Sequence, residues 1–598
     1  MAIQTVCDIF YTSVGYQKAE HLKSRKGGAW RAVSSSELQR AVEETSMGLR
    51  ALGVEKGERV AILSENRPEW AIADLATLCA GAVDAPVYAT LTPPQVQYIL
   101  GDSEAKVVFV STAAQAAKVA EVRDRLGSLL HVVSFDDPAP AGTMPLAELR
   151  AKGRDALARD PDAVRRRAGE VGKDDLATLI YTSGTTGDPK GVMLTHGNLV
   201  HNVVGAEKVF PAVDHEWTCL SFLPLCHSFE RTAGHNFMLY KGVTIAYAES
   251  VEKVPENMAE VRPHIMCSVP RLYEKMYARV NEKVANDPPL RQKIFRWAIG
   301  VGRRAFAHTV ANTEPGPLLK AQFALADKLV FSKIKDRTGG RLKLFISGGA
   351  PLAREIAEFF GAAGMLVCEG YGLSETSPVI TCNRPGAVRP GTVGLPLEHV
   401  EVKIAEDGEI LTRGPHVMKG YFKKPEATAE AIEKDGFFHT GDIGFVDADG
   451  FLHITDRKKD IIVTSGGKNI APQPIENRLK TNKFFTEVVM IGNKRNFACA
   501  LVVPNFEALE AWAKGKGLSG LPREELVKRP EAVAFYQALV NEMTGDLAQF
   551  EKIKKVALLP RELTQEAGEI TPTLKVKRRV VEERYRATID ALYGEGAA

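Results

Sequence analysis

Short apolar runs alternate with segments of helical periodicity over most of the chain before residue 395. Runs short enough to be buried strands occupy residues 59–63, 243–247, 264–269 and 343–347. After Pro270 the apolar positions repeat every four residues, which predicts a helix with one apolar face formed by Leu272, Met276, Val280 and Val284. This alternation predicts an α/β fold with layered, largely parallel sheets.

The pattern changes near residue 395. Short strand-like segments follow one another there, separated by Asp-Gly pairs at 407–408, 435–436 and 449–450, which predicts a small antiparallel, barrel-like section. Beyond DRKKD, residues 456–460, the sequence predicts an α+β unit with strands at 487–492, 497–503 and 556–559 and a long helix around 531–552. We therefore predict a large N-terminal domain over residues 1–458 and a smaller C-terminal domain over residues 459–598, joined by a hinge at Lys459.

Composition narrows the class of protein. Apolar residues make up 45% and charged residues 25% of the 598 positions, the profile of a folded globular protein. Because 77 basic residues face 74 acidic ones, the bulk charge does not favour binding to nucleic acid. The eight cysteines show no metal-ligand spacing, and we find neither a secretory signal nor an apolar run long enough to span a membrane. These features predict a cytoplasmic protein with reduced thiols.

A loop rich in glycine and hydroxyl residues follows the apolar run at 176–181. Its sequence, YTSGTTGDPKGV, combines backbone N–H groups, hydroxyl donors and one lysine, which suits a phosphate. The residues that we expect to grip the anion are Thr182, Ser183, Gly184, Thr185, Thr186, Gly187 and Lys190. Two residues separate Gly187 from Lys190, so the loop is not a Walker A motif, and a P-loop kinase or ATPase is disfavoured. A flexible linker is the alternative interpretation.

Two further glycine-rich segments follow strand-like runs. SGGAPL, residues 347–352, leaves a sheet edge open to a flat ligand, although such turns are common. EGYGLSET, residues 369–376, offers the ring of Tyr371 for stacking on a base and the carboxylate of Glu375 for Mg²⁺. Taken alone, the second segment also fits a glycine-rich turn with a solvated glutamate.

Three other motifs are weak when each stands alone. Asp442 in HTGD would ordinarily be a turn residue, and His227 in PLCHSFERTAG would ordinarily be structural. EITPTLKVKRR, residues 569–579, would ordinarily be a solvated basic tail.

Taken together in their order along the chain, however, the six motifs resemble those of the adenylate-forming (AMP-binding) superfamily. That superfamily includes acyl-CoA synthetases, luciferases and the adenylation domains of peptide synthetases. They span residues 181–579, and the length of the chain and a basic insertion before SGGAPL look like the long-chain acyl-CoA synthetase branch. The resemblance implies a long-chain fatty acid–CoA ligase with fatty acid, ATP and CoA as substrates and Mg²⁺ as cofactor. Its products would be acyl-CoA, AMP and pyrophosphate, formed through an acyl-adenylate.

The resemblance also implies a role for individual residues. Gly349, Ala350 and Pro351 would lie beside the adenine of the nucleotide. Tyr371, Gly372 and Ser374 of the EGYGLSET segment would also contact the nucleotide. Asp442 would bind the ribose, and Arg457 would reach the ribose or a phosphate. Glu375 would be the metal ligand, His227 would steady the reacting carboxylate, and Lys575 would be the catalytic lysine. Leu574 stands where the common pattern has glycine, which leaves Lys577 as a competitor for that role. After a swing about Lys459, the loop with Ser465, Gly466 and Gly467 would reach the CoA channel.

Two rival functions remain open at this stage. A fatty acyl-AMP ligase would stop at the adenylate, and a non-catalytic homologue would be expected to lack one of Glu375, Asp442 and Lys575, all of which are present. The sequence does not predict the acyl chain length or the oligomeric state.

The segment 288–313 has five basic residues, no acidic residue and several large apolar side chains. Such a segment is typical of contact with the surface of an anionic membrane, here the inner face. It is equally typical of a surface helix whose apolar face packs on its own domain.

Overall fold

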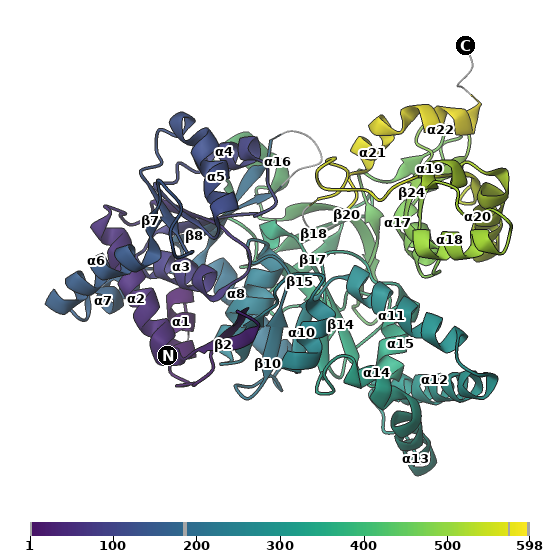
Figure 1. The fold of residues 1–598 in the computed structure, drawn as a ribbon, viewed down its shortest axis with the longest axis horizontal. Helices are drawn as coiled ribbons and strands as arrows, with labels where there is room; N and C mark the ends of the chain where they lie inside the picture. Colours follow the sequence, from purple (N-terminus) through teal and green to yellow (C-terminus); the bar gives the residue numbers. More distant parts are fainter. Residues whose placement is uncertain (1–2, 183–187, 572–574, 595–598) are drawn as a thin grey trace.

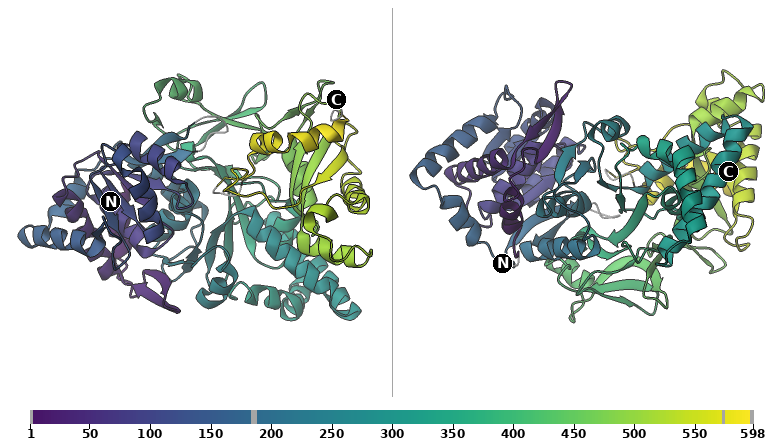
Figure 2. Two further views of the ribbon diagram at one scale, coloured as in Figure 1. Left: turned by 45° about the horizontal axis from the view of Figure 1, so that its top comes forward. Right: turned by 90° about the horizontal axis from the view of Figure 1, so that it is seen from below.

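The chain forms a large α/β part and a smaller C-terminal part (Figure 1). The computed structural model describes residues 3–182, 188–571 and 575–594. Both views of Figure 2 place the C-terminal elements, drawn in yellow-green, beside the teal helices that precede residue 340 and far from the N-terminus. The predicted α/β class is confirmed.

The first large sheet has nine strands in the order β16-β15-β14-β13-β12-β10-β11-β1-β2. From β14 to β1 neighbouring strands run parallel, and antiparallel strands complete both edges. Its strands are β1 (Leu22–Lys26), β2 (Ala29–Val33), β10 (Thr218–Ser221), β11 (Thr244–Tyr247), β12 (Ile265–Ser268), β13 (Leu344–Ser347), β14 (Leu366–Gly372), β15 (Val379–Cys382) and β16 (Leu395–Pro396). Three of the four predicted strand runs lie here as β11, β12 and β13.

The second large sheet has the order β19-β9-β8-β4-β3-β5-β6-β7. Its strands are β3 (Arg59–Leu63), β4 (Val83–Val87), β5 (Val107–Val110), β6 (His131–Ser134), β7 (Met144–Pro145), β8 (Leu176–Thr182), β9 (Lys190–Thr195) and β19 (Gly420–Tyr421). β8 and β9 are antiparallel, and their register pairs Thr182 with Lys190. The two ends of the predicted phosphate loop are therefore neighbours across the sheet. The rest of the loop, Ser183 to Gly187, lies outside the described residues.

Helices cover the faces of both sheets. The longer helices of the large part are α2 (Ser35–Ala51), α3 (Pro68–Cys79), α4 (Pro93–Asp102), α5 (Ala113–Val122), α6 (Leu146–Arg159), α8 (His196–Val209), α11 (Pro270–Ala285), α12 (Pro289–Val310) and α13 (Pro317–Ala326), with α15 (Arg354–Ala362) slightly shorter. The helix predicted after Pro270 is α11, although Tyr273, outside the predicted stripe, is its fully buried aromatic residue.

The section after residue 395 is an antiparallel sheet in the order β17-β18-β20-β21. Its strands are β17 (Glu401–Ile404), β18 (Glu409–Arg413), β20 (Phe438–Val446) and β21 (Leu452–Arg457). Gly408 and Gly450 take positive φ at the turns, the conformation that an Asp-Gly pair favours. The register of β20 and β21 pairs Asp442 with Arg457, which places two predicted site residues side by side.

The C-terminal part has its own hydrophobic cluster, made of residues from Ile462 to Ile589. A hairpin of β22 (Ile462–Val463) and β23 (Asn469–Ile470) precedes a sheet of β24 (Phe485–Ile491), β25 (Ala498–Pro504) and β26 (Ile553–Leu558). α17 (Pro472–Lys480), α18 (Phe506–Lys514), α20 (Pro530–Met543), α21 (Arg578–Arg584) and α22 (Arg586–Tyr593) complete it. An ion pair joins the large and the small part: Arg271 Nη2 of α11 lies 3.7 Å from Glu562 Oε2.

α12 and α13 form a hairpin at the edge of the molecule, with α13 lowest in the view of Figure 1. One face of α12 packs tightly on α15, because a Cβ atom on Gly302 would lie 2.3 Å from the carbonyl oxygen of Ala362. Phe306 lies directly against Gly361. The self-packing interpretation of this segment therefore holds for one face of α12.

Candidate active site

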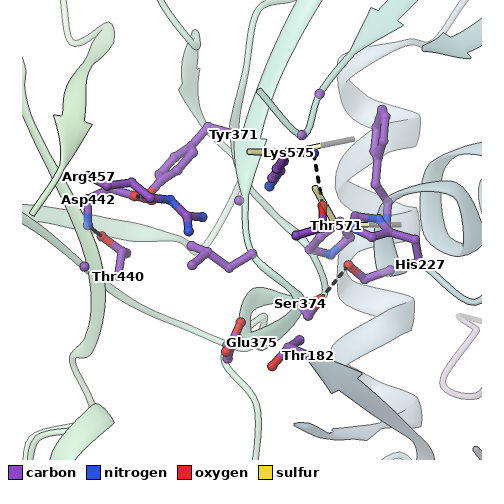
Figure 3. Close-up of a pocket in the computed structure, with 18 of the residues that line it drawn as sticks. Thr182, His227, Tyr371, Ser374, Glu375, Thr440, Asp442, Arg457, Thr571 and Lys575 are labelled. Atoms are coloured by element: carbon purple, nitrogen blue, oxygen red, sulfur yellow. Dashed lines mark hydrogen bonds and ion pairs between the residues drawn. The ribbon is translucent and has the colours of Figure 1, made fainter. Parts of the chain in front are cut away.

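A cavity of about 1060 Å³ lies between the two parts of the chain. The ends of β8, β14, β20 and β21 supply its walls from the large part, and residues around position 575 supply a wall from the small part. Predicted site residues that line it are Thr182, Lys190, His227, Gly349, Tyr371, Gly372, Ser374, Glu375, Asp442, Arg457, Lys459 and Lys575. Figure 3 shows Asp442 and Arg457 on one side, His227 on the other and Lys575 between them.

Some predicted residues lie elsewhere. Ala350 and Pro351 are not among the described residues that line the cavity, although Gly349 is. Ser465, Gly466 and Gly467 form the exposed turn between β22 and β23, also outside that lining. In this arrangement the small part presents Lys575 to the cavity, and the predicted CoA-side loop faces solvent.

Tyr371, Asp442 and Arg457 form one corner of the cavity. The Tyr371 hydroxyl donates a hydrogen bond to Asp442 Oδ2 at 2.7 Å, and Arg457 Nε lies 3.5 Å from Asp442 Oδ1. The backbone N–H of Asp442 donates to Thr440 Oγ1 at 3.1 Å, which orients the strand end. Burial raises the pKa of Asp442, whereas Arg457, Tyr371 and Lys575 oppose that rise. The corner therefore presents an oriented carboxylate with a cation beside it.

Glu375 lies in the short turn η4 (Ser374–Thr376). The Tyr421 hydroxyl donates to its Oε1 at 3.0 Å, and Lys190 Nζ lies 4.8 Å from the centre of the Tyr421 ring. Burial raises the pKa of Glu375, and hydrogen bonds together with the charges of Arg457 and Lys190 oppose the rise. β19 supplies Tyr421 by pairing with β9, so the phosphate loop and Glu375 share one neighbour.

His227 is held as a neutral ring. The backbone N–H of Phe229 donates to His227 Nδ1 at 3.2 Å, so the ring proton of the neutral form lies on Nε2. Burial, with the nearby charge of Lys575, lowers its pKa to about 3. The ring is therefore neutral at physiological pH, and its Nε2–H is the available hydrogen-bond donor.

Lys575 is a half-buried cation within the electrostatic influence of two carboxylates, Asp442 and Glu375. Its backbone N–H donates to Thr571 Oγ1 at 3.0 Å, as Figure 3 shows. Burial and the charge of Arg457 lower its pKa to about 8, while Asp442 and Glu375 oppose the lowering. Lys577 also lines the cavity, but of these two lysines it is Lys575 whose charge lowers the pKa of His227 and, together with Arg457, opposes the rise in the pKa of Asp442.

An apolar lobe extends the cavity from this polar region. Its wall comes from α8 and its C-cap, from the π-helix η2 (Glu230–Asn236) with α9 (Phe237–Tyr240), and from the residue after β16. The residues are Ala206, Val209, Phe210, Ala233, Phe237 and Leu397. A lobe without charged groups suits a hydrocarbon chain, because apolar surface is buried there without stranding a charge. Ser228 links the two regions, since its Oγ lies 3.2 Å from Ser374 Oγ.

Two thiols lie next to the reactive region. Cys382 lines the cavity and Cys226 precedes His227, and all eight cysteines of the chain are buried and unpaired. Burial raises the pKa of Cys382 to about 12 and raises that of Cys226 further. Both thiols therefore stay protonated at neutral pH.

The sequence did not indicate Tyr421, Ser228 or Thr440. Tyr421 is 46 residues from Glu375 along the chain, and only the pairing of β19 with β9 brings them together. Ser228 follows His227 directly, and Thr440 lies two residues before Asp442. This closeness along the chain was the one sequence feature that could have marked them as site residues.

The described residues contain no group of three or more His, Cys, Asp or Glu side chains that could hold a metal alone. A single carboxylate is nevertheless typical for Mg²⁺ bound with a nucleoside triphosphate, because phosphates and water complete the coordination. Glu375, with one oxygen engaged by Tyr421, fits that donor set.

Two family models match the chain. The model described as AMP-binding enzyme matches residues 12–422, and the model described as AMP-binding enzyme C-terminal domain matches residues 459–597.

Curated relatives and solved structures agree with these matches. The long-chain-fatty-acid–CoA ligase FadD15 of Mycobacterium bovis is 38% identical over 95% of this chain and 93% of its own length. Fatty acyl-CoA synthetase A of Dictyostelium discoideum is 34% identical over 96% of this chain and 88% of its own. The structure of the anthranilate CoA ligase AuaEII in complex with anthranoyl-AMP is 19% identical, has a TM-score of 0.72 and covers 98% of both chains, which shows a common fold.

Proposed function

Because the chain belongs to the family of AMP-binding enzymes, we propose that it is a ligase that joins a long-chain fatty acid to CoA at the expense of ATP. The observation that carries this proposal is one cavity that combines an apolar lobe with a cluster of cations and carboxylates. The fatty acid would occupy the lobe, and the nucleotide would occupy the polar region.

In the first step a carboxylate oxygen attacks the α-phosphorus of ATP, the bond to the β-phosphate oxygen breaks, and acyl-AMP and pyrophosphate form. Two anions must approach each other, and at 4 Å their repulsion is about 1 kcal/mol in water but about 4 kcal/mol at an effective dielectric constant near 20. Lys575 and Lys190 would offset it with positive charge, and the neutral His227 would donate its Nε2–H to the carboxylate without first binding a second proton.

The nucleotide is assigned to the corner of Tyr371 and Asp442. The Asp442 carboxylate would accept hydrogen bonds from the ribose hydroxyls, Arg457 would face the ribose or phosphate, and Tyr371 and Gly349 would border the base. Thr182, Lys190 and the loop between them would hold the phosphates. Glu375 would hold Mg²⁺, which neutralises phosphate charge when bound.

The second step transfers the acyl group from AMP to the thiol of CoA. We assign it to a second arrangement, in which residues 459–598 turn about Lys459 and bring Ser465, Gly466 and Gly467 to the cavity. The observed arrangement supports the first step, since Lys575 lines the cavity and that loop is exposed. We place the reaction in the cytoplasm, where ATP and CoA are available, with the acyl substrate drawn from the inner membrane surface.

Product analysis tests the function. We expect CoA-dependent formation of AMP and pyrophosphate with fatty acids of long chain, and weaker formation with short ones. ADP as the nucleotide product would overturn the assignment. Acyl-AMP that accumulates and never passes to CoA would identify an adenylate-only enzyme, and lack of any nucleotide turnover would identify a non-catalytic homologue.

A further inference from the structure

Exposed large apolar side chains are concentrated in one short stretch of the chain. Twelve large hydrophobic residues are exposed in the described part of the chain, and five of them lie between residues 290 and 329. These five are Leu290, Trp297, Leu318, Leu325 and Leu329, with exposed fractions of 68%, 38%, 73%, 50% and 39%. Scattered exposed residues need no explanation, but a concentration of this kind marks a contact surface.

The five residues follow the periodicity of the helices that carry them. Leu318, Leu325 and Leu329 are spaced by seven and four residues along α13 and the π-helix η3 (Asp327–Phe331) that continues it, so they lie on one side. On α12, Leu290 and Trp297 are spaced by seven residues. The opposite face of α12 is the one that packs on α15 through Gly302 and Phe306. We call the exposed side chains of residues 290–333, carried by α12, α13, η3 and the start of α14 (Ser332–Asp336), the hairpin surface.

The hairpin surface is strongly basic. Residues 290–333 contain eight Lys or Arg and two Asp or Glu, a net charge of +6, whereas the whole chain has +3. The remainder of the protein is therefore net negative. Both acidic residues are already paired with lysines, Glu314 with Lys320 at 2.7 Å and Asp327 with Lys335 at 2.7 Å. Within the described residues no carboxylate forms an ion pair with Lys293, Arg296, Arg303, Lys328 or Lys333.

We propose that the hairpin surface docks this protein on an anionic lipid bilayer, with the exposed leucines and Trp297 in the interface and the unpaired basic side chains at the lipid phosphates. The proposal rests on the proposed function, because a long-chain fatty acid partitions into bilayers and an enzyme held there meets it at high local concentration. No described helix has the length and apolar character to cross a bilayer, so the contact is peripheral. Trp is favoured at membrane interfaces, and unpaired cations match the negative surface.

Vesicle sedimentation tests the docking without any need for activity. The protein is mixed with vesicles of phosphatidylcholine containing phosphatidylglycerol, or of phosphatidylcholine alone. We expect binding to the anionic vesicles that weakens with salt. Each basic residue near such a surface contributes about fivefold in partitioning, so the triple variant Lys293→Glu, Arg296→Glu, Arg303→Glu should bind on the order of a hundredfold more weakly.

Two further variants separate the contributions. The double variant Leu318→Ser, Leu325→Ser should weaken binding through lost apolar insertion while leaving the charge intact. The matched control Lys514→Glu, Lys516→Glu, Lys528→Glu makes the same change of net charge at exposed positions of the small part and should bind within about twofold of the original protein. Equal losses in the charge variant and its control would overturn the proposal.

Two other results would overturn the proposal that the hairpin surface binds a bilayer. Wild-type protein that ignores anionic vesicles would refute docking. A dimer in solution that the leucine variant converts to monomers would also overturn it, because a second copy would then cover the surface. Failure of the proposed function is distinguishable, since AMP formation from a soluble medium-chain acid without vesicles should be equal in the wild type and all three variants.

Discussion

Removing the Lys575 ammonium should separate the two half-reactions. Its pKa of about 8, against an ordinary value of 10.5, corresponds to about 3 kcal/mol by which burial and the charge of Arg457 disfavour the protonated form. Anionic phosphates and carboxylate relieve that cost, so the charge is most strongly stabilised where adenylation occurs. Loss of one such stabilising group costs about 10²–10³ in rate, and we expect that loss of acyl-AMP formation in Lys575→Ala.

The pH profile gives a second measure of the same residue. A lysine with a lowered pKa loses its charge as the pH rises through that value, so kcat/KM for adenylation should fall about tenfold for each pH unit above about 8. The Lys575→Ala variant should lack this fall. His227, with a pKa of about 3, should add no loss of activity between pH 5 and 7.

The assay follows pyrophosphate release for adenylation and thioester formation from preformed acyl-AMP and CoA for the second step. Lys575→Ala should keep the second step near the wild-type rate, because in the proposed second arrangement the small part has carried the lysine away from the cavity. Lys577→Ala is the matched control and should retain both steps. Adenylation lost in the Lys577 variant and kept in the Lys575 variant would reverse the assignment. Failure of both steps together in Lys575→Ala would refute the alternation of domains.

Three other changes have sharp expectations. Glu375→Gln should raise the Mg²⁺ concentration needed for half-maximal adenylation, and an unchanged Mg²⁺ titration would remove Glu375 from the metal site. Ala206→Trp should fill part of the apolar lobe and shift the preference of a fatty acid panel toward shorter chains, by about fourfold for each methylene excluded; an unaltered preference would place the acyl chain elsewhere. Gly302→Ala should lower the free energy of unfolding by about 1–3 kcal/mol in denaturant titrations, because its Cβ meets the Ala362 carbonyl. Gly300→Ala on the same helix meets nothing within 4 Å and should be neutral or stabilising, so equal losses in both would contradict this packing.

The sequence predicted those turns and strands whose conformation depends on residues adjacent in the chain. The Asp-Gly pairs predicted the antiparallel strands after residue 395, and Gly408 and Gly450 take the positive φ that makes those turns. The helix predicted around 531–552 ends earlier, at Met543, where Thr544 is the C-cap and Gly545 follows. That stop signal was present in the sequence, and the apolar periodicity beyond it obscured it.

Partners brought together by sheet register could not be predicted in this way. The hydrogen bond from the Tyr371 hydroxyl to the Asp442 carboxylate forms only because β14 and β20, which belong to different sheets, meet at one corner of the cavity. The burial that lowers the pKa of Lys575 requires both parts of the chain around one cavity. Likewise, periodicity identified an amphipathic segment at 288–313, but only the placement of α15 shows which face of α12 is covered.

The protonated state of the buried cysteines bears on chemoselectivity. An acyl-adenylate is an acylating agent, and a neighbouring thiolate would capture the acyl group and inactivate the protein. Cys382 lines the cavity and Cys226 adjoins His227, yet their raised pKa values keep both as poorly nucleophilic thiols. If acyl-AMP forms in this cavity as proposed, self-acylation is thereby suppressed, and the acyl group is kept for the thiol of CoA.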